Sequence, residues 1–366
     1  MVKETFGFIL GEFGKGGQET QLKYLTTQMQ KEKRQCCVIV WNYEENKSKY
    51  AEELQDAGVR LLLLNNESIF RKIFLSRLFL NKNQAATLHS FTHYLNFFAW
   101  CICLFSIITA IGGIRSSLKR VRREYGFLRF WINGILPIRK ISNNQLYRFG
   151  MKSPLISIAF RSTKIITNHL DIHQFDFKKP KKERIIKTAS IARLFPEKSL
   201  NVLIDAIYHL KIQGYNIQHI HAGTGKLQSA LETLIDSKNL QENFLFFGET
   251  NDVSGFLKDK YLFILSSSYE GYPNVIMEAM ACGKAIVSTD CGDVKYLVED
   301  RVNGFIVPVG DSLAMSNAVE ILVNDYSKLL EFSENSRKKA EKEFQLSHLV
   351  SETLKAYSMI GVENNW

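Results

Sequence analysis

Two carboxylates, Glu270 and Glu278, lie close together where an apolar stretch of the sequence gives way to a helix-like one. Residues 262–266 are predicted to form a buried strand, and the segment after Glu270 is predicted to enter a helix with Glu278 one turn in. Carboxylates accept hydrogen bonds from sugar hydroxyls. The N–H groups and positive dipole end of a helix instead favour an anion such as a phosphate. The segment therefore offers acceptors for a polyol beside a phosphate site, and a nucleotide-sugar carries both groups.

Two cations, Arg193 and Lys198, follow the predicted strand 184–191 and precede a predicted helix. An arginine binds a diphosphate through planar, bidentate contacts, and a lysine supplies a mobile point charge. An arginine paired with a surface acid is an equally good interpretation of this segment in isolation. A glycine turn at Gly223 follows the next predicted strand. Glycines, cations and acids thus all lie at the carboxyl ends of predicted strands, where open α/β sheets hold their ligands.

A glycine-rich loop containing Gly16 and Gly17 follows the first predicted strand, 5–10. Glycines at such a turn let the backbone approach a phosphate closely. The spacing is not that of a dinucleotide-binding loop, and residues 41–43 (Trp-Asn-Tyr) stand where such a fold needs a ribose-binding acid. These features argue against a nicotinamide-dependent oxidoreductase. A plain turn remains an alternative to a phosphate-binding loop.

The elements that must position these residues alternate between strand and helix along the chain. Predicted strands are residues 5–10, 36–41, 59–64, 85–88 and 107–111 in the first half, and 184–191, 217–221, 244–247, 262–266 and 285–288 in the second. Two such alternating runs predict two doubly wound α/β domains. The break between them is expected within 168–182. Residues 115–161 are predicted to be mostly helical, and the stretch 329–359 is predicted to be helical and amphipathic.

Composition is that of a globular protein, with 366 residues, 45% hydrophobic and 23% charged. The six cysteines lie inside apolar runs without a CxxC pair, which predicts buried, reduced thiols in a cytosolic protein. The N-terminus opens on a strand-like segment and shows no signal peptide.

Residues 97–114 are uncharged and near the length of a membrane span, but Ser106 and Thr109 interrupt them. We expect a buried helix followed by a buried strand there.

The net charge of +10 is concentrated between Arg115 and Lys140, where eight Lys or Arg residues accompany one acid and Phe127, Phe130 and Trp131 lie among them. Such a stretch can bind anionic lipid headgroups. A solvated helix face with core aromatic residues is the alternative. No nucleic-acid-binding motif accompanies the charge, so nucleic acid is not an expected partner.

These motifs, in their order and spacing, resemble glycosyltransferase family 4, a family of retaining enzymes with the GT-B fold. The resemblance is strongest over residues 187–311 and includes the Glu-x7-Glu pattern of Glu270 and Glu278; it is looser in the first half, around Gly16 and His89. It implies two Rossmann-like domains facing a central cleft. Residues 1–167 would form the acceptor-binding domain, 168–345 the donor-binding domain, and 346–366 a helix returning to the first domain.

The resemblance also implies roles for individual residues. Arg193 and Lys198 would hold the donor diphosphate and stabilise it during catalysis, Glu270 would position sugar hydroxyls, and Glu278 would accept from the ribose. The implied donor-binding set is Gly16, Gly17, Arg193, Lys198, Gly223, Gly248, Glu270, Gly271, Tyr272, Pro273, Asn274, Val275 and Glu278.

His89 is the implied acceptor-side catalytic residue, although the second histidine of the family's His-x-His pattern is Phe91 here. His93 is an alternative, and a packed polar role is another. Two further positions depart from the family, because Ala192 and Ser199 stand where glycines are common.

The implied activity is metal-independent transfer, with retention, of a hexosyl or N-acetylhexosaminyl group from a nucleotide-sugar. The resemblance implies a UDP-sugar ahead of a GDP-sugar, no cofactor and no bound metal. The acceptor would be a glycan, glycolipid or lipid-linked molecule in cell-surface polysaccharide synthesis. We expect a cytoplasmic protein, peripheral on an anionic membrane face. A catalytically silent GT-B binding or assembly subunit is the alternative function.

Overall fold

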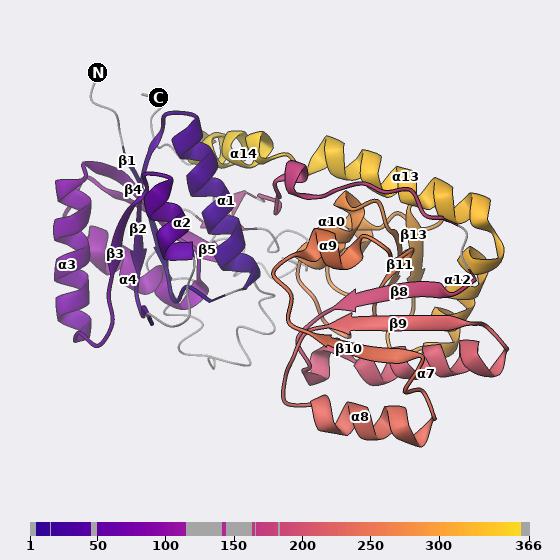
Figure 1. Cartoon of the computed structure of the whole chain (residues 1–366). Coiled ribbons are helices and arrows are strands. Elements are labelled where there is room, and N and C mark those ends of the chain that lie inside the picture. Colours follow the sequence, from indigo (N-terminus) through magenta and orange to yellow (C-terminus); the bar gives the residue numbers. More distant parts are fainter. Residues whose placement is uncertain are drawn as a thin grey trace, which may run out of the picture. The chain divides into compact units, whose positions relative to one another are not determined.

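The chain divides into two compact units in the computed structural model, which describes residues 5–14, 16–44, 50–114, 141–143, 163–164, 166–181 and 184–359. Unit 1 comprises Met1–His169 with Leu346–Trp366, and unit 2 comprises Leu170–Gln345. These divisions lie beside the boundaries expected from the sequence, 167/168 and 345/346. Figure 1 shows that each unit has its own sheet with helices packed against it.

Unit 1 is built on a seven-stranded parallel sheet with the order β3-β2-β1-β4-β5-β6-β7. All six residues of β1, which lies between β2 and β4, are buried, as expected for a parallel strand covered on both faces. The chain reverses its direction across the sheet between β1 and β4. The strands are β1 (Thr5–Leu10), β2 (Gln35–Val40), β3 (Arg60–Leu63), β4 (Ala85–Ser90), β5 (Thr109–Ile114), β6 (Ile141–Asn143) and β7 (Thr163–Lys164).

Helices cover both faces of this sheet. The helices α1 (Gly17–Lys31) and α2 (Tyr50–Asp56) pack against each other on one face. On the opposite face, α3 (Ile69–Lys82) packs against α4 (Asn96–Cys103), which follows the short 3-10 helix η2 (His93–Leu95) (Figure 1). The last helix, α14 (Leu346–Met359), packs against α1 and so belongs to unit 1.

Unit 2 is built on a six-stranded parallel sheet with the order β10-β9-β8-β11-β12-β13. Every residue of β11 and β12 is buried, which matches their apolar sequences. The direction of chain progression across the sheet reverses between β8 and β11. The strands are β8 (Ile186–Ile191), β9 (Ile217–Ala222), β10 (Phe244–Gly248), β11 (Leu262–Leu265), β12 (Ala285–Thr289) and β13 (Gly304–Val307).

The helices of unit 2 form two layers. One layer contains α7 (Leu200–Ile212), α8 (Gln228–Ser237) and α12 (Ser312–Asn324), and their apolar residues share a core with the sheet. The other contains α9 (Val253–Leu257), α10 (Asn274–Ala281) and α13 (Tyr326–Glu343) (Figure 1). Shorter elements are η3 (Ile172–Gln174), η4 (Pro196–Lys198) and α11 (Val294–Leu297). The prediction of two doubly wound α/β domains is confirmed.

The stretch 329–359 is helical, as predicted, and forms two helices, α13 and α14, because the chain leaves helical geometry at Phe344, whose carbonyl accepts from Leu170 N at 3.0 Å. Within the segment predicted to be mostly helical, the described residues 141–143 form a strand. The rest of the basic, aromatic stretch 115–140 lies outside the described residues.

The uncharged stretch 97–114 divides into α4 and β5, as predicted. In the described part of the chain, no helix has the length and apolar character needed to cross a membrane. All six cysteines are free, and only Cys101 among them is partly exposed.

Candidate functional site

The carboxyl ends of β8 and β11 form the candidate site in unit 2. These strands are neighbours at the point where the strand order reverses, so the connections that leave them run to opposite faces of the sheet. Such a switch point leaves a crevice that open α/β sheets use for ligands. The loop 192–199 leaves β8 with two of the predicted cations, and the loop 266–273 leaves β11 with Glu270.

An ion pair joins the two loops. Lys198 Nζ lies 2.6 Å from Glu270 Oε1, and the two side chains retain only 18% and 11% of their exposure. Ser267 Oγ donates to the same Oε1 at 2.7 Å. Within the described residues, Oε2 of Glu270 accepts no hydrogen bond. The carboxylate is therefore held through one oxygen while the other keeps its lone pairs for a ligand hydroxyl.

Backbone and hydroxyl contacts fix the two loops to each other. Ser266 Oγ donates to the Lys198 carbonyl at 2.9 Å. The backbone N–H of Ser268 donates to the Glu197 carbonyl, also at 2.9 Å. The ion pair is thus held in place by contacts that do not involve the two charged groups.

The end of β12 and the loop that follows it also contact the Glu270 loop. Thr289 Oγ1 donates to the Ser267 carbonyl at 2.6 Å, and Asp293 N donates to the Gly271 carbonyl at 3.0 Å. Sequence reasoning missed this loop. It could have been predicted from the polar residues that follow the buried strand β12, whose carboxyl end lies at the same edge of the sheet.

Arg193 is exposed, with its guanidinium carbon 5.1 Å from the centroid of the Phe195 ring. The guanidinium makes no hydrogen bond or ion pair with another residue in the described part of the chain. It therefore keeps all five donors for an anion. The structure brings Lys198 and Glu270 together and leaves Arg193 on the same loop as a separate cation.

A buried chain of side chains ends at the carbonyl just before Arg193. His221 Nε2 lies 2.9 Å from the Ala192 carbonyl oxygen, which can only accept, so Nε2 donates. Nδ1 of this neutral ring accepts from Ser190 Oγ at 2.6 Å. Ser190 then accepts from His219 Nε2 at 2.8 Å, and Thr188 Oγ1 donates to His219 Nδ1 at 2.8 Å. Because the Ala192 carbonyl can only accept, it fixes which atom donates in each hydrogen bond of this series of side chains.

Burial keeps both histidines neutral. It lowers the pKa of His221 to about 4 and holds the pKa of His219 well below its usual value. The sequence carried a signal for this chain, because two histidines alternate with apolar residues in β9 and so face the same side of the strand. We did not predict it.

Gly223 approaches the same Ala192 carbonyl so closely that a Cβ would overlap its oxygen, and its φ of +138° disfavours other residues. Its N–H donates to the Gly248 carbonyl at 2.7 Å. The turns after β9 and β10 therefore support the Arg193 loop through backbone contacts alone.

The helix α10 begins directly after the Glu270 loop. Its N-terminal flank is Pro273, which gives no side-chain cap to the first turn. The predicted backbone donors 271–275 lie at this helix start, which suits an anion. Glu278 is one turn further along α10 and partly exposed, and desolvation raises its pKa to about 7. The two predicted acids thus differ, because among the described residues Glu270 contacts a cation and Glu278 contacts none.

The predicted residues of unit 1 lie at the carboxyl edge of its sheet. Gly16 is the N-cap of α1 with an extended φ of −90°, and the Glu19 carboxylate occupies the space that a Cβ of Gly16 would take. Any residue can adopt that backbone conformation, so the close-approach role of Gly16 and Gly17 remains a prediction.

His89 is enclosed rather than exposed. Its side chain is 2% exposed, its Nδ1 lies 2.8 Å from the Tyr357 hydroxyl of α14, and its ring contacts those of Phe8 and Phe91. His93 is also buried, which lowers its pKa to about 4. This geometry matches the packed polar alternative for His89.

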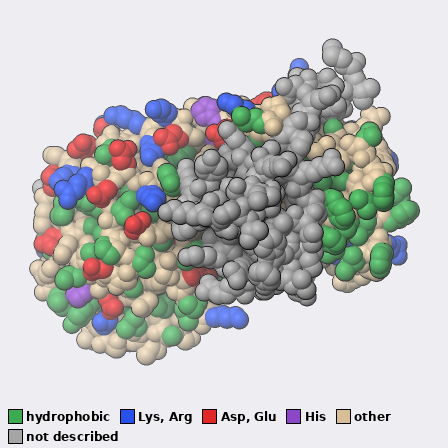
Figure 2. Space-filling model, turned by 180° about the vertical axis from the view of Figure 1, so that it is seen from behind, with side chains coloured by type: hydrophobic (Ala, Val, Ile, Leu, Met, Phe, Trp, Pro, Cys, Tyr) green, Lys and Arg blue, Asp and Glu red, His purple; other side chains and the backbone are tan. Residues whose placement is uncertain are grey.

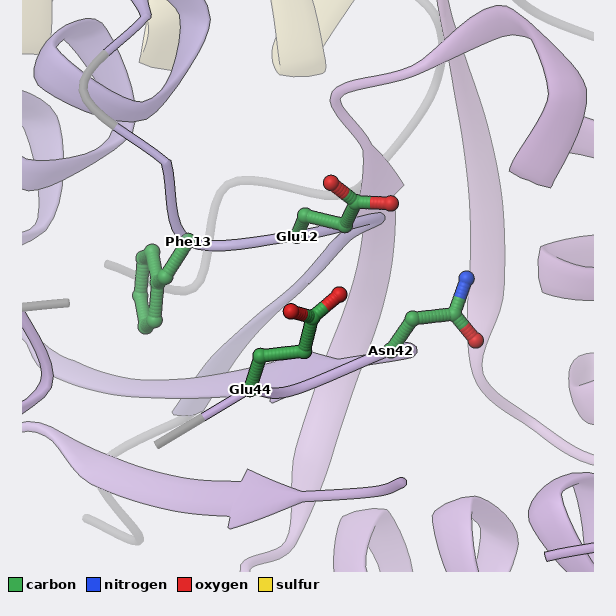
Figure 3. Close-up of a pocket in the computed structure, with 4 residues that line it drawn as sticks. All are labelled: Glu12, Phe13, Asn42 and Glu44. Carbon is green, nitrogen blue, oxygen red and sulfur yellow. The ribbon is translucent and has the colours of Figure 1, made fainter. Parts of the chain in front are cut away.

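A small hollow lies at the carboxyl ends of β1 and β2. Figure 3 shows it lined by Glu12, Phe13, Asn42 and Glu44. Its two acids suit hydroxyl groups better than a phosphate. No group of three or more His, Cys, Asp or Glu side chains among the described residues is arranged to hold a metal ion.

Residues 171–339 match the family described as Glycosyl transferases group 1. The crystal structure of Anabaena Alr3699/HepE in complex with UDP-glucose is similar over 97% of this chain and 99% of that one, with a TM-score of 0.80 and 17% identity. The chain has the GT-B fold. Its second unit is the part that matches the group 1 family.

Curated relatives of this GT-B chain include enzymes of bacterial glycan synthesis. The amylovoran biosynthesis glycosyltransferase AmsK of Erwinia amylovora is 26% identical over 63% of this chain and 57% of its own length. The N-acetylgalactosamine-N,N'-diacetylbacillosaminyl-diphospho-undecaprenol 4-alpha-N-acetylgalactosaminyltransferase of Campylobacter jejuni is 28% identical over 54% of each chain. The chain thus spans little more than half the length of the curated relatives it matches.

Proposed function

We propose that this protein is a retaining, metal-independent glycosyltransferase that moves a hexosyl or N-acetylhexosaminyl group from a nucleotide-sugar, with a UDP-sugar preferred. The observation that carries the proposal is the Lys198–Glu270 pair at the switch point of unit 2. It places a cation for a diphosphate beside an acceptor for sugar hydroxyls, with Arg193 on the same loop.

In this proposal the leaving diphosphate is stabilised by Arg193, Lys198 and the start of α10. Negative charge grows on the phosphate oxygen as its bond to the sugar C1 breaks, and fixed cations and helix N–H groups lower the energy of that state. The acceptor oxygen bonds to C1 from the same face, and its proton passes to the departing phosphate. Glu270 Oε2 accepts from a sugar hydroxyl, and Glu278 accepts from the ribose.

We assign acceptor binding to unit 1 and propose a glycan, glycolipid or lipid-linked acceptor in cell-surface polysaccharide synthesis. Support comes from the names of AmsK and the Campylobacter transferase, which act in amylovoran synthesis and on a diphospho-undecaprenol-linked sugar. A lipid-linked acceptor fits a cytoplasmic protein that works at a membrane face.

The test is a thermal-shift screen across UDP-, GDP-, ADP- and dTDP-sugars, followed by assay of nucleoside diphosphate release with and without EDTA. We expect stabilisation by a UDP-sugar, slow release without acceptor, and no loss of rate with EDTA. The anomeric proton coupling of a transfer product, read by NMR, reports retention. Binding without any release or transfer would instead support a catalytically silent subunit.

A further inference from the structure

Unit 1 exposes a large apolar surface that its fold does not require. We call it the α3 surface, and it consists of Ile69, Phe70, Phe74 and Leu78 on α3 with Phe105 and Ile107 on the loop between α4 and β5. The exposure of Phe70, Phe105 and Ile107 is 87%, 93% and 98%. Figure 2 shows hydrophobic side chains gathered on this unit, at the right of the view. An exposed apolar patch of this kind marks an interaction site.

The helix α3 presents its apolar face to solvent. Phe70, Phe74 and Leu78 follow one another at single-turn spacing on the exposed side. The buried side includes Lys72 and Ser76. Lys72 Nζ is satisfied there by the Trp41 carbonyl and by Asn42 Oδ1, at 2.5 and 2.8 Å. These polar contacts, together with the packing of Leu80, Ile73 and Phe79 against the core, fix the orientation of α3 and leave the apolar stripe facing outward.

The loop that adds Phe105 and Ile107 is held in shape. Arg77 Nη2 of α3 donates to the Phe105 carbonyl at 2.9 Å, and Ser106 Oγ donates to the Cys103 carbonyl at 2.7 Å. Phe105 has a φ of +58°, a conformation that costs a non-glycine residue about 1 kcal/mol or more. The loop retains this strain while directing two apolar side chains outward beside α3.

Charge around the α3 surface selects its occupant. The helix carries Arg71, Lys72, Arg77 and Lys82 and no Asp or Glu, and Arg71 and Lys82 are exposed. A second copy related by two-fold symmetry would bring these cations against themselves, which is unfavourable. An anionic bilayer accepts both features, because aromatic side chains enter its headgroup boundary and cations contact its phosphates.

We propose that the α3 surface docks unit 1 on an anionic phospholipid bilayer. It consists of described residues that are separate from the basic stretch 115–140, and it does not depend on the donor chemistry of unit 2. Docking through α3 would bring the unit assigned to the acceptor to the membrane, where a lipid-linked acceptor resides.

The test is flotation of the full chain with vesicles of phosphatidylethanolamine and phosphatidylglycerol, against vesicles of phosphatidylcholine alone. We expect binding to the anionic vesicles that weakens as salt rises. Phe70→Ser with Phe74→Ser, and separately Phe105→Ser with Ile107→Ser, should lower the partition coefficient about tenfold or more. Arg71→Glu with Lys82→Glu should remove most of the salt dependence. The matched control is Ile212→Ser with Leu313→Ser, two exposed apolar residues of unit 2 that should change nothing.

Three results would overturn the proposal. The first is vesicle binding by wild type that both serine pairs leave intact, and the second is no vesicle binding at all. The third is a dimer, detected by light scattering without lipid, that the Phe70 and Phe74 pair dissociates, since that would assign the surface to a second copy. Thermal shift with a UDP-sugar, run on the same variants, reports unit 2 separately. If no nucleotide-sugar stabilises the protein, the vesicle-binding result is unaffected. If the vesicles do not bind, the result of the donor screen is likewise unaffected.

Discussion

Lys198 Nζ and Glu270 Oε1 are 2.6 Å apart, although the two residues leave different strands of the unit 2 sheet. The contact neutralises a cation and an anion at the edge where a ligand with both phosphate and hydroxyl groups is proposed to bind. A bound diphosphate competes with Glu270 for Lys198, and a sugar hydroxyl competes with Lys198 for Glu270. The pair is thus a ligand-free arrangement in which each charge holds the position of the other.

Arg193→Ala and Lys198→Ala are each expected to lower kcat/KM for transfer by about 30- to 150-fold. This is the loss expected when a charged hydrogen bond worth about 2–3 kcal/mol in the transition state is removed. Initial rates against donor concentration measure it, with Lys342→Ala on the exposed part of α13 as the matched control. Wild-type kinetics in both variants would refute the role of the cations.

Glu270→Gln and Glu278→Gln should affect different kinetic constants. The first removes a charged acceptor beside the reacting sugar, so kcat should fall more than affinity. The second acts on the remote ribose, so the donor KM should rise with kcat little changed. Steady-state kinetics of both variants measure this, and the opposite pattern would show that the two roles are exchanged.

The raised pKa of Glu278 makes ligand-free stability depend on pH. Its folded pKa is about 7 against a reference of 4.5, so the folded state binds more protons between those values. Stability contributed by the protonated group is therefore present below pH 4.5 and is lost as pH rises to about 7, by about 3 kcal/mol. Urea unfolding at several pH values should show this slope in wild type. Glu278→Gln should lack it, and an unchanged slope in that variant would assign the effect elsewhere.

The buried series of side-chain hydrogen bonds that runs from Thr188 through His219 and His221 to the Ala192 carbonyl is expected to position the Arg193 loop. His221→Phe keeps the ring volume but removes the bond to the carbonyl, so the donor KM should rise about fivefold, as for one neutral hydrogen bond. His221→Gln keeps a donor near the Nε2 position and should recover most of the loss. Nitrogen-15 NMR of wild type should report Nε2–H tautomers for His219 and His221. A stability loss with an unchanged KM would indicate a purely structural role.

Ser199 occupies a position that favours glycine. Its φ and ψ are 47° and 42°, in the left-handed region, at the start of α7. A β-branched side chain is strained there, so Ser199→Val should lower the free energy of unfolding by about 1–2 kcal/mol. Ser199→Gly should leave it nearly unchanged, because relief of strain offsets the added chain entropy. Urea midpoints measure both, and equal effects would contradict the assigned conformation.

The sequence allowed prediction of the features that depend on local pattern. Buried parallel strands are continuous apolar runs, so β1, β11 and β12 were recognisable. The polar segments that follow β8 and β11 located Arg193 and Glu270. The Lys198–Glu270 contact and the orientation of His89 depend on which strands lie side by side, which no local pattern specifies. The outward apolar face of α3 was missed. Helix periodicity shows that apolar residues share one face of a helix, but it does not show whether that face packs against the core or faces solvent.

The location of α14 determines when each unit can be completed during synthesis. Unit 2 is one continuous segment, Leu170–Gln345, whereas unit 1 is assembled from both sides of it. Tyr357 of α14 is fully buried, stacks near Phe6 in β1 and contacts His89 in β4. Because β1 is translated before unit 2 and α14 after it, the packing of β1 is completed only once α14 has been made, while unit 2 can fold in the interval. Unit 1 therefore begins to emerge from the ribosome before unit 2 but is completed after it.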